Sequence, residues 1–314
     1  MVSSTSIVVV SHNKRSELAE CIASVQQLAP QAVKTIVVDN DSRDGSADMI
    51  ASEFPDVLLI RSPSNSGAAG GRNLGAQEAV GDVILFLDDD AEAFPDSLAA
   101  ISECLDLHPE VGIVCGKTFG RAPQDLLMST GIAVELGRAA IWDIGAGETD
   151  RGQYDAPCEV AACGAFALAI RSDVFDALGG FDDAFNPYGW EDVDICLRAR
   201  RAGYKTLYWP KALFRHKGTR QGRPAVVSYE LAKARNFIRI MGRYATGAEW
   251  LSCNAYLPVR AVKVLCKVAT GAFGSARRAG LAALPASPTL RHQSNIGSVA
   301  AGDDPLSQRR DPTS

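Results

Sequence analysis

The 314-residue sequence lacks the marks of several large protein classes. No apolar run is long enough to span a bilayer, and the first one, residues 7–10, is too short for a signal peptide. None of the eight cysteines forms a CxxC pair, so we expect buried thiols in a reducing cytoplasm. A disulfide between two of them is the alternative that the spacing does not exclude. The sequence contains neither GxGxxG, the fingerprint of dehydrogenases, nor the Walker motif of P-loop proteins.

Acidic residues are missing from one long tract of the chain. The net charge is −5, so no nucleic-acid partner is expected, yet residues 250–314 carry eight basic against three acidic residues. A helix expected from residue 256 to about 273 places apolar residues on one stripe with Arg and Lys beside it. We expect residues 250–280 to contact an anionic membrane surface or to pack against a partner. Contact with a membrane would place this protein, expected in the cytoplasm, on the inner face of the membrane.

The chain is organised around an apolar run that ends in three carboxylates. Residues 83–87 lack polar alternation, which predicts a central strand buried on both faces. Asp88, Asp89 and Asp90 follow directly, at the strand end where open α/β sheets bind ligands. Three adjacent like charges are costly unless a cation or strong hydrogen-bond donors compensate them, and carboxylate oxygens favour Mg²⁺ or Mn²⁺. The alternative is a solvated acidic loop.

Alternating strand and helix patterns surround this run. Strands are expected at residues 7–11, 34–40 and 57–61 with helices between them, a rhythm that predicts an α/β fold with parallel strands. Asp39 closes the second strand at the same edge as the carboxylates, either as a ligand or as a turn residue. The glycine-dense residues 64–76 then run into a helix, and such a helix N-terminus is suited to phosphate.

A second acidic pair lies at Glu191 and Asp192. Both carboxylates open an expected helix, where the helix dipole stabilises negative charge, and simple capping is the alternative interpretation. The preceding Tyr-Gly-Trp at residues 188–190 offers a partly apolar wall that could raise the pKa of a carboxylate and make it a general base. In an earlier expected strand, the small residues Gly164 and Ala165 allow the backbone to approach a ligand.

Four stretches carry a family resemblance: NSGAAGGRNLG at residues 65–75, GDVILFLDDD at 81–90, GGFD at 179–182 and WEDVDICLR at 190–198. Over residues 5–220 the sequence resembles the family 2 glycosyltransferases of the GT-A fold and is most similar to bacterial rhamnosyltransferase-like members. The resemblance implies a Rossmann-like, mostly parallel sheet flanked by helices, to which the chain adds a C-terminal helical segment. It also implies a metal-dependent, inverting enzyme that moves a sugar from a nucleoside-diphosphate sugar to an acceptor hydroxyl.

The resemblance assigns roles to individual residues. Asp192 becomes the catalytic base, and the acceptor is expected to bind Glu191, Trp190, Gly164 and Ala165. The nucleotide sugar is expected to bind Ser11, Asp39, Asn65, Gly70, Gly71, Arg72, Asp88 and Asp89. Among these, Asp39 would meet the nucleobase and Asp89 the ribose. The metal, Mg²⁺ or Mn²⁺, is expected to bind Asp90, Asp88 and His216.

The expected organisation divides the chain into four parts. Residues 1–115 bind the nucleotide sugar, 116–223 bind the acceptor, 224–284 form the helical segment and 285–314 a disordered tail. The donor is expected to be a dTDP- or UDP-sugar, and the acceptor a glycan or lipid-linked molecule in cell-surface glycan or glycoconjugate biosynthesis. Two alternatives stay open. One is a sugar nucleotidyltransferase, for which residues 11–15 make a poor triphosphate loop, and the other is a non-catalytic nucleotide-sugar or metal-binding module.

Overall fold

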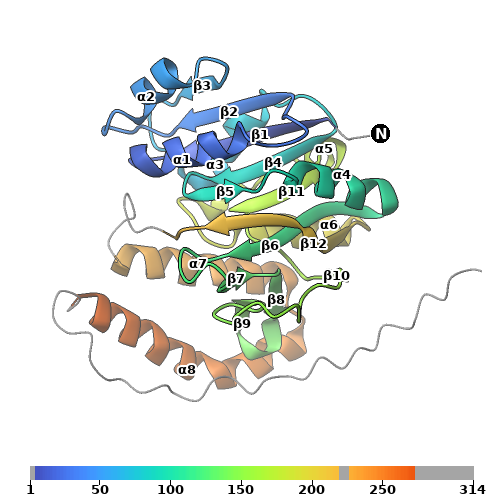
Figure 1. The fold of residues 1–314 in the computed structure, drawn as a ribbon. Coiled ribbons are helices and arrows are strands. Elements are labelled where there is room, and N and C mark those ends of the chain that lie inside the picture. Colours follow the sequence, from blue (N-terminus) through green and yellow to red (C-terminus); the bar gives the residue numbers. More distant parts are fainter. Residues whose placement is uncertain (1–3, 219–225, 273–314) are drawn as a thin grey trace, which may run out of the picture. The chain divides into compact units, whose positions relative to one another are not determined.

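A ten-stranded sheet runs through the structure, a computed structural model that describes residues 4–218 and 226–272 (Figure 1). Its strands are β1 (Thr5–Ser11), β2 (Lys34–Asp39), β3 (Leu58–Arg61), β4 (Val83–Asp88), β5 (Ala91–Ala93), β6 (Val111–Phe119), β7 (Leu127–Ser129), β10 (Cys158–Glu159), β11 (Ala167–Arg171) and β12 (Lys205–His216). They lie in the order β10-β12-β6-β11-β4-β1-β2-β3, with β5 paired to β12 and β7 to β6. The run from β4 to β3 is parallel, as is the β6 and β12 pair, and β11 lies antiparallel between β4 and β6. A separate hairpin pairs β8 (Ile132–Glu135) with β9 (Ala140–Asp143).

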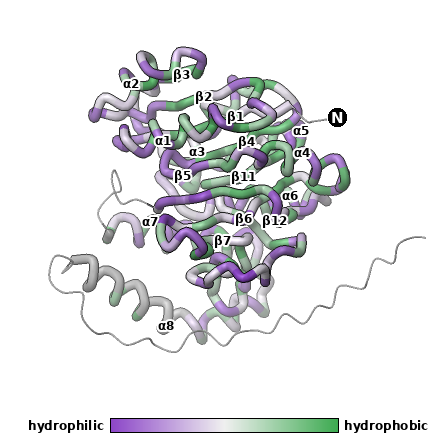
Figure 2. Tube along the Cα trace, viewed as in Figure 1, coloured by the Kyte–Doolittle hydropathy of each residue, from purple (hydrophilic) through white to green (hydrophobic). Residues whose placement is uncertain are grey.

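Helices cover both faces of this sheet. They are α1 (Arg15–Val25), α2 (Ser46–Glu53), α3 (Gly67–Ala76), α4 (Ser97–Leu107), α5 (Ser172–Leu178), α6 (Glu191–Arg201), α7 (Val226–Tyr244) and α8 (Gly247–Ala272), with 3₁₀ turns η1 (Leu136–Arg138) and η2 (Asp183–Phe185). Helices α1, α2 and α4 contribute to one buried apolar cluster, and α3, α5, α6 and α7 to the other. Successive residues of β4 alternate between the two, with Leu85 in the first and Phe86 in the second. Figure 2 shows hydrophobic residues along the inner strands, so the predicted α/β class and the two-sided burial of β4 are confirmed.

Helices α7 and α8 confirm the C-terminal helical extension. Helix α8 begins at Gly247, earlier than the expected residue 256. Helix α7 packs as part of the fold, because Phe237, Ile240 and Met241 are buried in the same apolar cluster as Phe86. No helix in the described part of the chain is long and apolar enough to cross a membrane. The predicted tail at residues 285–314 lies outside the described residues.

One sheet joins the two predicted halves of the fold. The expected boundary at residue 115 falls inside β6, which pairs with β11 on one side and β12 on the other. The described residues accordingly form one compact unit. The assignment of donor binding to one half and acceptor binding to the other stays a prediction, because it concerns ligands and not the path of the backbone.

Candidate active site

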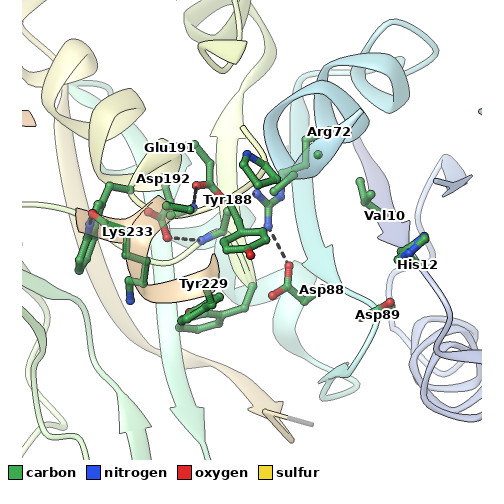
Figure 3. A pocket seen from close by; sticks show the side chains of 18 of the residues that line it. Val10, His12, Arg72, Asp88, Asp89, Tyr188, Glu191, Asp192, Tyr229 and Lys233 are labelled. Atoms are coloured by element: carbon green, nitrogen blue, oxygen red, sulfur yellow. Dashed lines mark hydrogen bonds and ion pairs between the residues drawn. The ribbon is translucent and has the colours of Figure 1, made fainter. Parts of the chain in front are cut away.

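A cleft of about 1260 Å³ opens at the carboxyl ends of β1 and β4. The two strands run parallel with Val10 opposite Asp88, so both end at the edge where open α/β sheets bind ligands. The start of α3, the start of α6 and the first turns of α7 complete the wall. Figure 3 shows Asp192 and Lys233 on one side of the cleft and Asp88 and Asp89 on the other.

Three side chains at the end of β4 and β12 can hold a metal ion. One ligand atom each of Asp88, Asp90 and His216 lies within 4.8 Å of the others. His216 Nε2 is 2.9 Å from Asp90 Oδ1 and 3.7 Å from Asp88 Oδ2. The imidazole stacks on Phe166 with ring centroids 4.9 Å apart, which fixes its plane. Two carboxylates and an imidazole converging at this spacing fit one divalent cation.

A lysine that the sequence analysis did not assign also faces the acidic triplet. Lys14 Nζ lies 3.0 Å from Asp89 Oδ1 and 3.0 Å from Asp90 Oδ2. Burial raises the pKa of Asp89 to about 6, against the opposing charge of Lys14. Burial alone would also raise the pKa of Asp90, but the hydrogen bond and charge of His216, together with Lys14, hold it below its usual range. Asp90 therefore stays ionised and available as a ligand.

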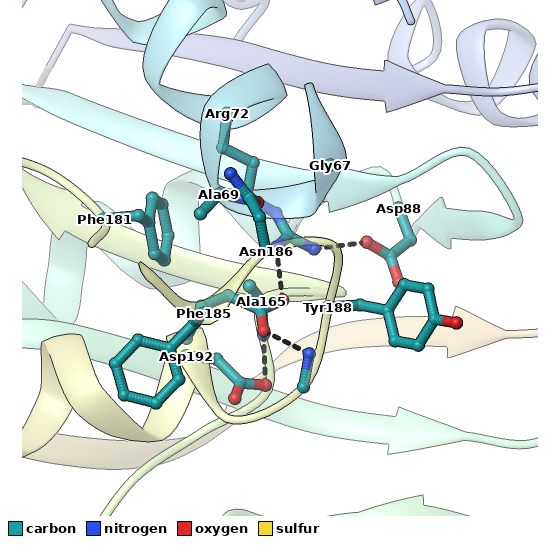
Figure 4. A network of polar contacts seen from close by, with 12 residues as sticks. Gly67, Ala69, Arg72, Asp88, Ala165, Phe181, Phe185, Asn186, Tyr188 and Asp192 are labelled. Carbon is teal, nitrogen blue, oxygen red and sulfur yellow. Dashed lines mark hydrogen bonds and ion pairs between the residues drawn. The ribbon is translucent and has the colours of Figure 1, made fainter. Parts of the chain in front are cut away.

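Arg72 connects the two sides of the cleft. Arg72 is 7% exposed, and its guanidinium donates to Asp88 Oδ1 (2.8 Å; Figure 4) and to Glu191 Oε1 (2.9 Å). The other oxygen of Glu191 accepts a hydrogen bond from Gly189 N–H at 2.6 Å. Both oxygens of Glu191 are therefore engaged in holding Arg72 and the turn before α6, which makes Glu191 a structural anchor of the site.

Asp192 has a different environment from its neighbour. Its Oδ1 accepts from Val193 N–H (2.8 Å) and its Oδ2 from Ala165 N–H (3.4 Å), and no described basic side chain forms an ion pair with it. Burial raises the pKa of Asp192 to about 7, and the charge of Glu191 adds to this rise while Arg72 opposes it. A carboxylate that titrates near neutral pH is suited to general-base chemistry.

The loop before Asp192 is held from α7. Asn236 is fully buried, and its Nδ2 donates to the carbonyl oxygens of Phe185 (2.5 Å), Tyr188 (3.1 Å) and Gly189 (3.1 Å). The indole N–H of Trp190 donates to the carbonyl oxygen at position 233 (3.0 Å). Trp190 adopts the left-handed φ of 71°, a conformation that a non-glycine residue keeps only when its surroundings impose it. Helix α7 therefore sets the geometry of the turn that leads into the base.

Residues 6–176, which include β1, β4 and the acidic triplet, match the family model for glycosyl transferase family 2. The chain belongs to this family. An uncharacterized glycosyltransferase of Haemophilus influenzae is 32% identical over 109 residues, which are 35% of this chain and 37% of the relative. An N-acetylglucosaminyl-diphospho-decaprenol L-rhamnosyltransferase of Mycobacterium tuberculosis is 26% identical over 240 residues, which are 69% of this chain and 77% of the relative. The predicted family is confirmed.

Solved structures show the fold of this family 2 glycosyltransferase. GalNAc-T7 with UDP, GalNAc and Mn²⁺ has a TM-score of 0.64 at 17% identity, covering 79% of this chain and 49% of that one. The mannosyltransferase PcManGT from Pyrobaculum calidifontis, in complex with GDP-Man and Mn²⁺, has a TM-score of 0.52 at 19% identity, covering 87% and 80%. Together with the observed sheet, these likenesses confirm the predicted GT-A fold.

Most residues predicted for the site of the glycosyltransferase line the cleft. The structure places there Ser11, Asn65, Arg72, Asp88, Asp89, Asp90, Ala165, Trp190, Glu191, Asp192 and His216. Among the described residues, those outside its wall are Asp39, Gly70, Gly71 and Gly164. Asn40 lines the cleft in place of Asp39, and its Nδ2 donates to Asn65 Oδ1 (3.1 Å) and Gly67 O (3.0 Å). The roles of all these residues toward donor, acceptor and metal stay predictions.

The glycines outside the wall are required by contacts within the protein. A Cβ on Gly71 would lie 2.6 Å from Val10 Cγ1, so only glycine lets α3 approach β1 this closely. A Cβ on Gly164 would lie 2.1 Å from the Phe166 ring, the same ring that stacks on His216. These glycines position the ligand-binding elements instead of facing the cleft.

Sequence reasoning missed Lys14, Asn236 and Lys233. Lys14 carried a usable signal, because it follows β1 by three residues at the same sheet edge as the acidic triplet. Lys233 and Asn236, both on α7, carried no such signal in the sequence. An amphipathic pattern shows which face of a helix is buried, but it does not show which loop that face contacts.

Proposed function

We propose that this protein is an inverting glycosyltransferase that moves a sugar from a nucleoside-diphosphate sugar to an acceptor hydroxyl. The observation that carries the proposal is the placement of Asp192 in the same cleft as the cluster of Asp88, Asp90 and His216. Burial raises the pKa of Asp192 to about 7, so a large fraction of the carboxylate is ionised near neutral pH and can accept a proton. A non-catalytic binding module would have no need of such a base.

In this mechanism Asp192 takes the proton of the acceptor hydroxyl as its oxygen attacks the anomeric carbon. Attack from the face opposite the diphosphate displaces the nucleoside diphosphate in line and inverts the anomeric centre. Asp88, Asp90 and His216 would hold a divalent ion, which would supply positive charge for the departing diphosphate. Arg72 holds Asp88 in place and anchors α6 through Glu191. General-base assistance is expected to contribute about 10²–10⁴-fold.

The finer assignments extend this proposal. An imidazole beside two carboxylates suits Mn²⁺ better than Mg²⁺, and both solved neighbours named above contain Mn²⁺. We favour a UDP- or dTDP-sugar bound by residues 1–115 and an acceptor bound by residues 116–223. The name of the mycobacterial relative supports rhamnosyl or another hexosyl transfer to a lipid-linked acceptor, in cell-surface glycan or glycoconjugate biosynthesis.

We also propose that α8 lies on an anionic membrane surface at the inner face of the membrane. Its exposed apolar side chains include Leu251 (77%), Val262 (58%) and Leu265 (66%). The sequence has no acidic residue between Glu249 and Asp303, so nothing in this tract repels anionic headgroups.

A donor panel tests the proposed function. UDP-, dTDP- and GDP-sugars are incubated with the protein and Mn²⁺, and release of the nucleoside diphosphate is measured with and without EDTA. We expect one nucleotide class to be hydrolysed slowly in the absence of acceptor, and EDTA to stop the release. If no sugar nucleotide is bound or hydrolysed with any divalent metal, the proposal is wrong.

A further inference from the structure

The cleft has a third wall that the proposed roles do not use. It is formed by the end of β9 and the start of α7, and it carries Asp143, Lys233 and Tyr229, with Tyr188 facing them from the loop before α6. The ion pairs of the acidic triplet within the described chain are made by Lys14, Arg72 and His216, and not by this third wall. The role of this wall is binding of the acceptor, and this role depends on the proposed glycosyltransferase function.

Asp143 presents an unsatisfied oxygen. It is the last residue of β9 and lines the cleft, and within the described residues its buried Oδ1 has no hydrogen-bond partner. Burial raises the pKa of Asp143, while a hydrogen bond from Ser129 and the charge of Lys233 act in the opposite direction. A buried carboxylate oxygen without a donor is costly, so a ligand that brings a hydroxyl to it would gain free energy.

Lys233 presents an ammonium group to which no carboxylate of the described residues lies close. Its Nζ lies 4.4 Å from the centroid of the Trp190 ring and 5.5 Å from that of Tyr229. In the described chain no carboxylate lies within 4.0 Å of it, whereas Lys14 and Arg72 in the same cleft each pair with two. The aromatic faces hold the ammonium by cation–π attraction and leave its N–H donors directed elsewhere.

Two stacked aromatic rings lie beside these groups. Tyr188 and Tyr229 stack with centroids 5.0 Å apart and an interplanar angle of 27°. Both residues line the cleft, and Figure 3 shows Tyr188 between Asp192 and Asp88. The parts of these rings that face the cleft can pack against the C–H groups of a sugar ring while the polar groups bind its hydroxyls.

We propose that Asp143, Lys233 and the Tyr188–Tyr229 pair form a subsite for an uncharged, hydroxyl-rich sugar ring of the acceptor. The carboxylate accepts and the ammonium donates hydrogen bonds, so together they offer both kinds of partner that a sugar hydroxyl uses. Arg235, which also lines the cleft, donates to the carbonyl oxygen of Asn186. A phosphate placed here would meet the charge of Asp143 at close range. If the acceptor carries a phosphate, that group lies outside this subsite.

The test measures binding of neutral sugars directly. Methyl glycosides of glucose, galactose, mannose, rhamnose and N-acetylglucosamine are titrated by saturation-transfer NMR in the presence of Mg²⁺ and the nucleoside diphosphate found in the donor panel. Asp143→Asn and Lys233→Met should each weaken binding of the preferred glycoside by at least about tenfold, the loss of a hydrogen bond to a charged group. Affinity for the nucleoside diphosphate, measured by calorimetry, should change by less than about twofold in both. The matched controls Asp176→Asn and Lys211→Met lie outside the cleft and should bind like the wild type.

Several results would overturn the subsite. They are no glycoside binding by the wild type, equal binding by both cleft variants, or loss of nucleoside-diphosphate affinity in step with glycoside affinity. The melting temperature is measured for every variant, and if Asp143→Asn does not fold, Lys233→Met decides the question alone. Metal-dependent hydrolysis of the donor is scored separately, so the subsite can fail while the proposed function stands.

Discussion

The wall formed by β1, β4 and α3, here called the donor wall, sets basic groups against its carboxylates. Asp88 forms an ion pair with Arg72, and Asp90 is paired with Lys14 and His216. The wall formed by residues 185–192, here called the base wall, holds Asp192, which accepts hydrogen bonds only from backbone N–H groups among the described residues. The pKa of Asp90 is held below its usual range, whereas burial raises that of Asp192 to about 7.

This difference shows how counterions change the effect of burial. Burial acts toward a higher pKa at both carboxylates, but His216 and Lys14 reverse it at Asp90, whereas Arg72 only partly opposes it at Asp192. One cleft can therefore keep a fixed negative charge for a cation and, on the other side, a carboxylate that gains and loses a proton.

The largest effect is expected from removing the metal ion that the donor wall is proposed to bind. EDTA should abolish transfer, and Mn²⁺ or Mg²⁺ should restore it, because the ion carries the leaving-group charge. Asp90→Ala should lower transfer on the order of 10³-fold, as expected for several kcal/mol of charge stabilisation. The measurement is product formation from the preferred donor, with the surface variant Glu103→Gln as control. Undiminished turnover in EDTA or in Asp90→Ala would rule out the metal site.

Removing the charge of the base wall should have the next largest effect. Asp192→Asn keeps the shape of the side chain and removes the proton acceptor, so transfer should fall by about 10²–10⁴-fold. Donor affinity should hold, because Asp192 lies across the cleft from the acidic triplet. Glu191→Gln should be milder, since Glu191 serves as an anchor. Intact transfer in Asp192→Asn, or a complete loss of donor binding, would show that the carboxylate has another role.

The pH profile tests the same contrast without mutation. Only ionised Asp192 accepts a proton, so transfer should rise with pH and level off above about 7, the pKa of this group. Between pH 8 and pH 5 the rate should fall about 100-fold, following the ionised fraction. Stability should change in the opposite direction. The raised pKa of Asp192 in the folded state stabilises the fold at low pH. This contribution to stability is lost as pH rises through about 7.

Thermal denaturation measures that contribution to stability. Asp192→Asn should melt higher than the wild type at pH 8, and the difference should shrink at pH 5, where wild-type Asp192 is protonated. A wild-type rate that is flat between pH 5 and pH 8 would refute the raised pKa.

A smaller effect is expected where α7 supports the base wall. Asn236→Ala leaves three buried carbonyl oxygens without their donor and should lower the free energy of unfolding by about 2–3 kcal/mol. Transfer should fall about tenfold through kcat, because the turn before Asp192 loses its fixed geometry. Ile238→Ala on the exposed face of α7 is the matched control. A loss of stability with unchanged kcat would limit Asn236 to a folding role.

The smallest effect concerns α8, remote from either wall. The wild type should sediment partly with anionic vesicles, and salt should weaken this by screening. Substituting Val262→Glu together with Leu265→Glu should reduce the bound fraction severalfold, because both side chains are exposed and apolar. Val80→Glu, at another exposed apolar position, serves as control. Equal binding by the double variant would exclude α8 as the anchor.

The acidic triplet of the donor wall was predictable because the strand and its three carboxylates are contiguous in sequence. Residues 83–90 have the pattern of a buried strand that ends in carboxylates, and strand order brought Asp88 to the expected sheet edge. Asp39 was predicted to meet the nucleobase, and the structure places its neighbour Asn40 on the cleft wall, so the ligand contact of Asp39 stays a prediction. Successive side chains of a strand point to opposite faces, so a shift of one position decides which residue reaches the ligand.

The base wall was predictable only in part. Glu191 and Asp192 were found from their helix start, but their different environments depend on Arg72, which is more than a hundred residues away. Asn236 and Lys233 act on the loop through tertiary contacts that no local pattern encodes. Glycine density alone did not show that Gly71 allows α3 to pack closely on Val10.

Helix α7 begins fifty residues beyond the end of the match to the family model, at residue 176, yet it lends Tyr229, Lys233 and Asn236 to the cleft and the loop that borders it. The acidic triplet and the part of the cleft that α7 contributes are therefore encoded in separate stretches of the sequence. Recombination between those stretches can exchange one and spare the other. A chimera that carries the α7 of a relative should inherit that relative's choice of acceptor while keeping its own sugar donor.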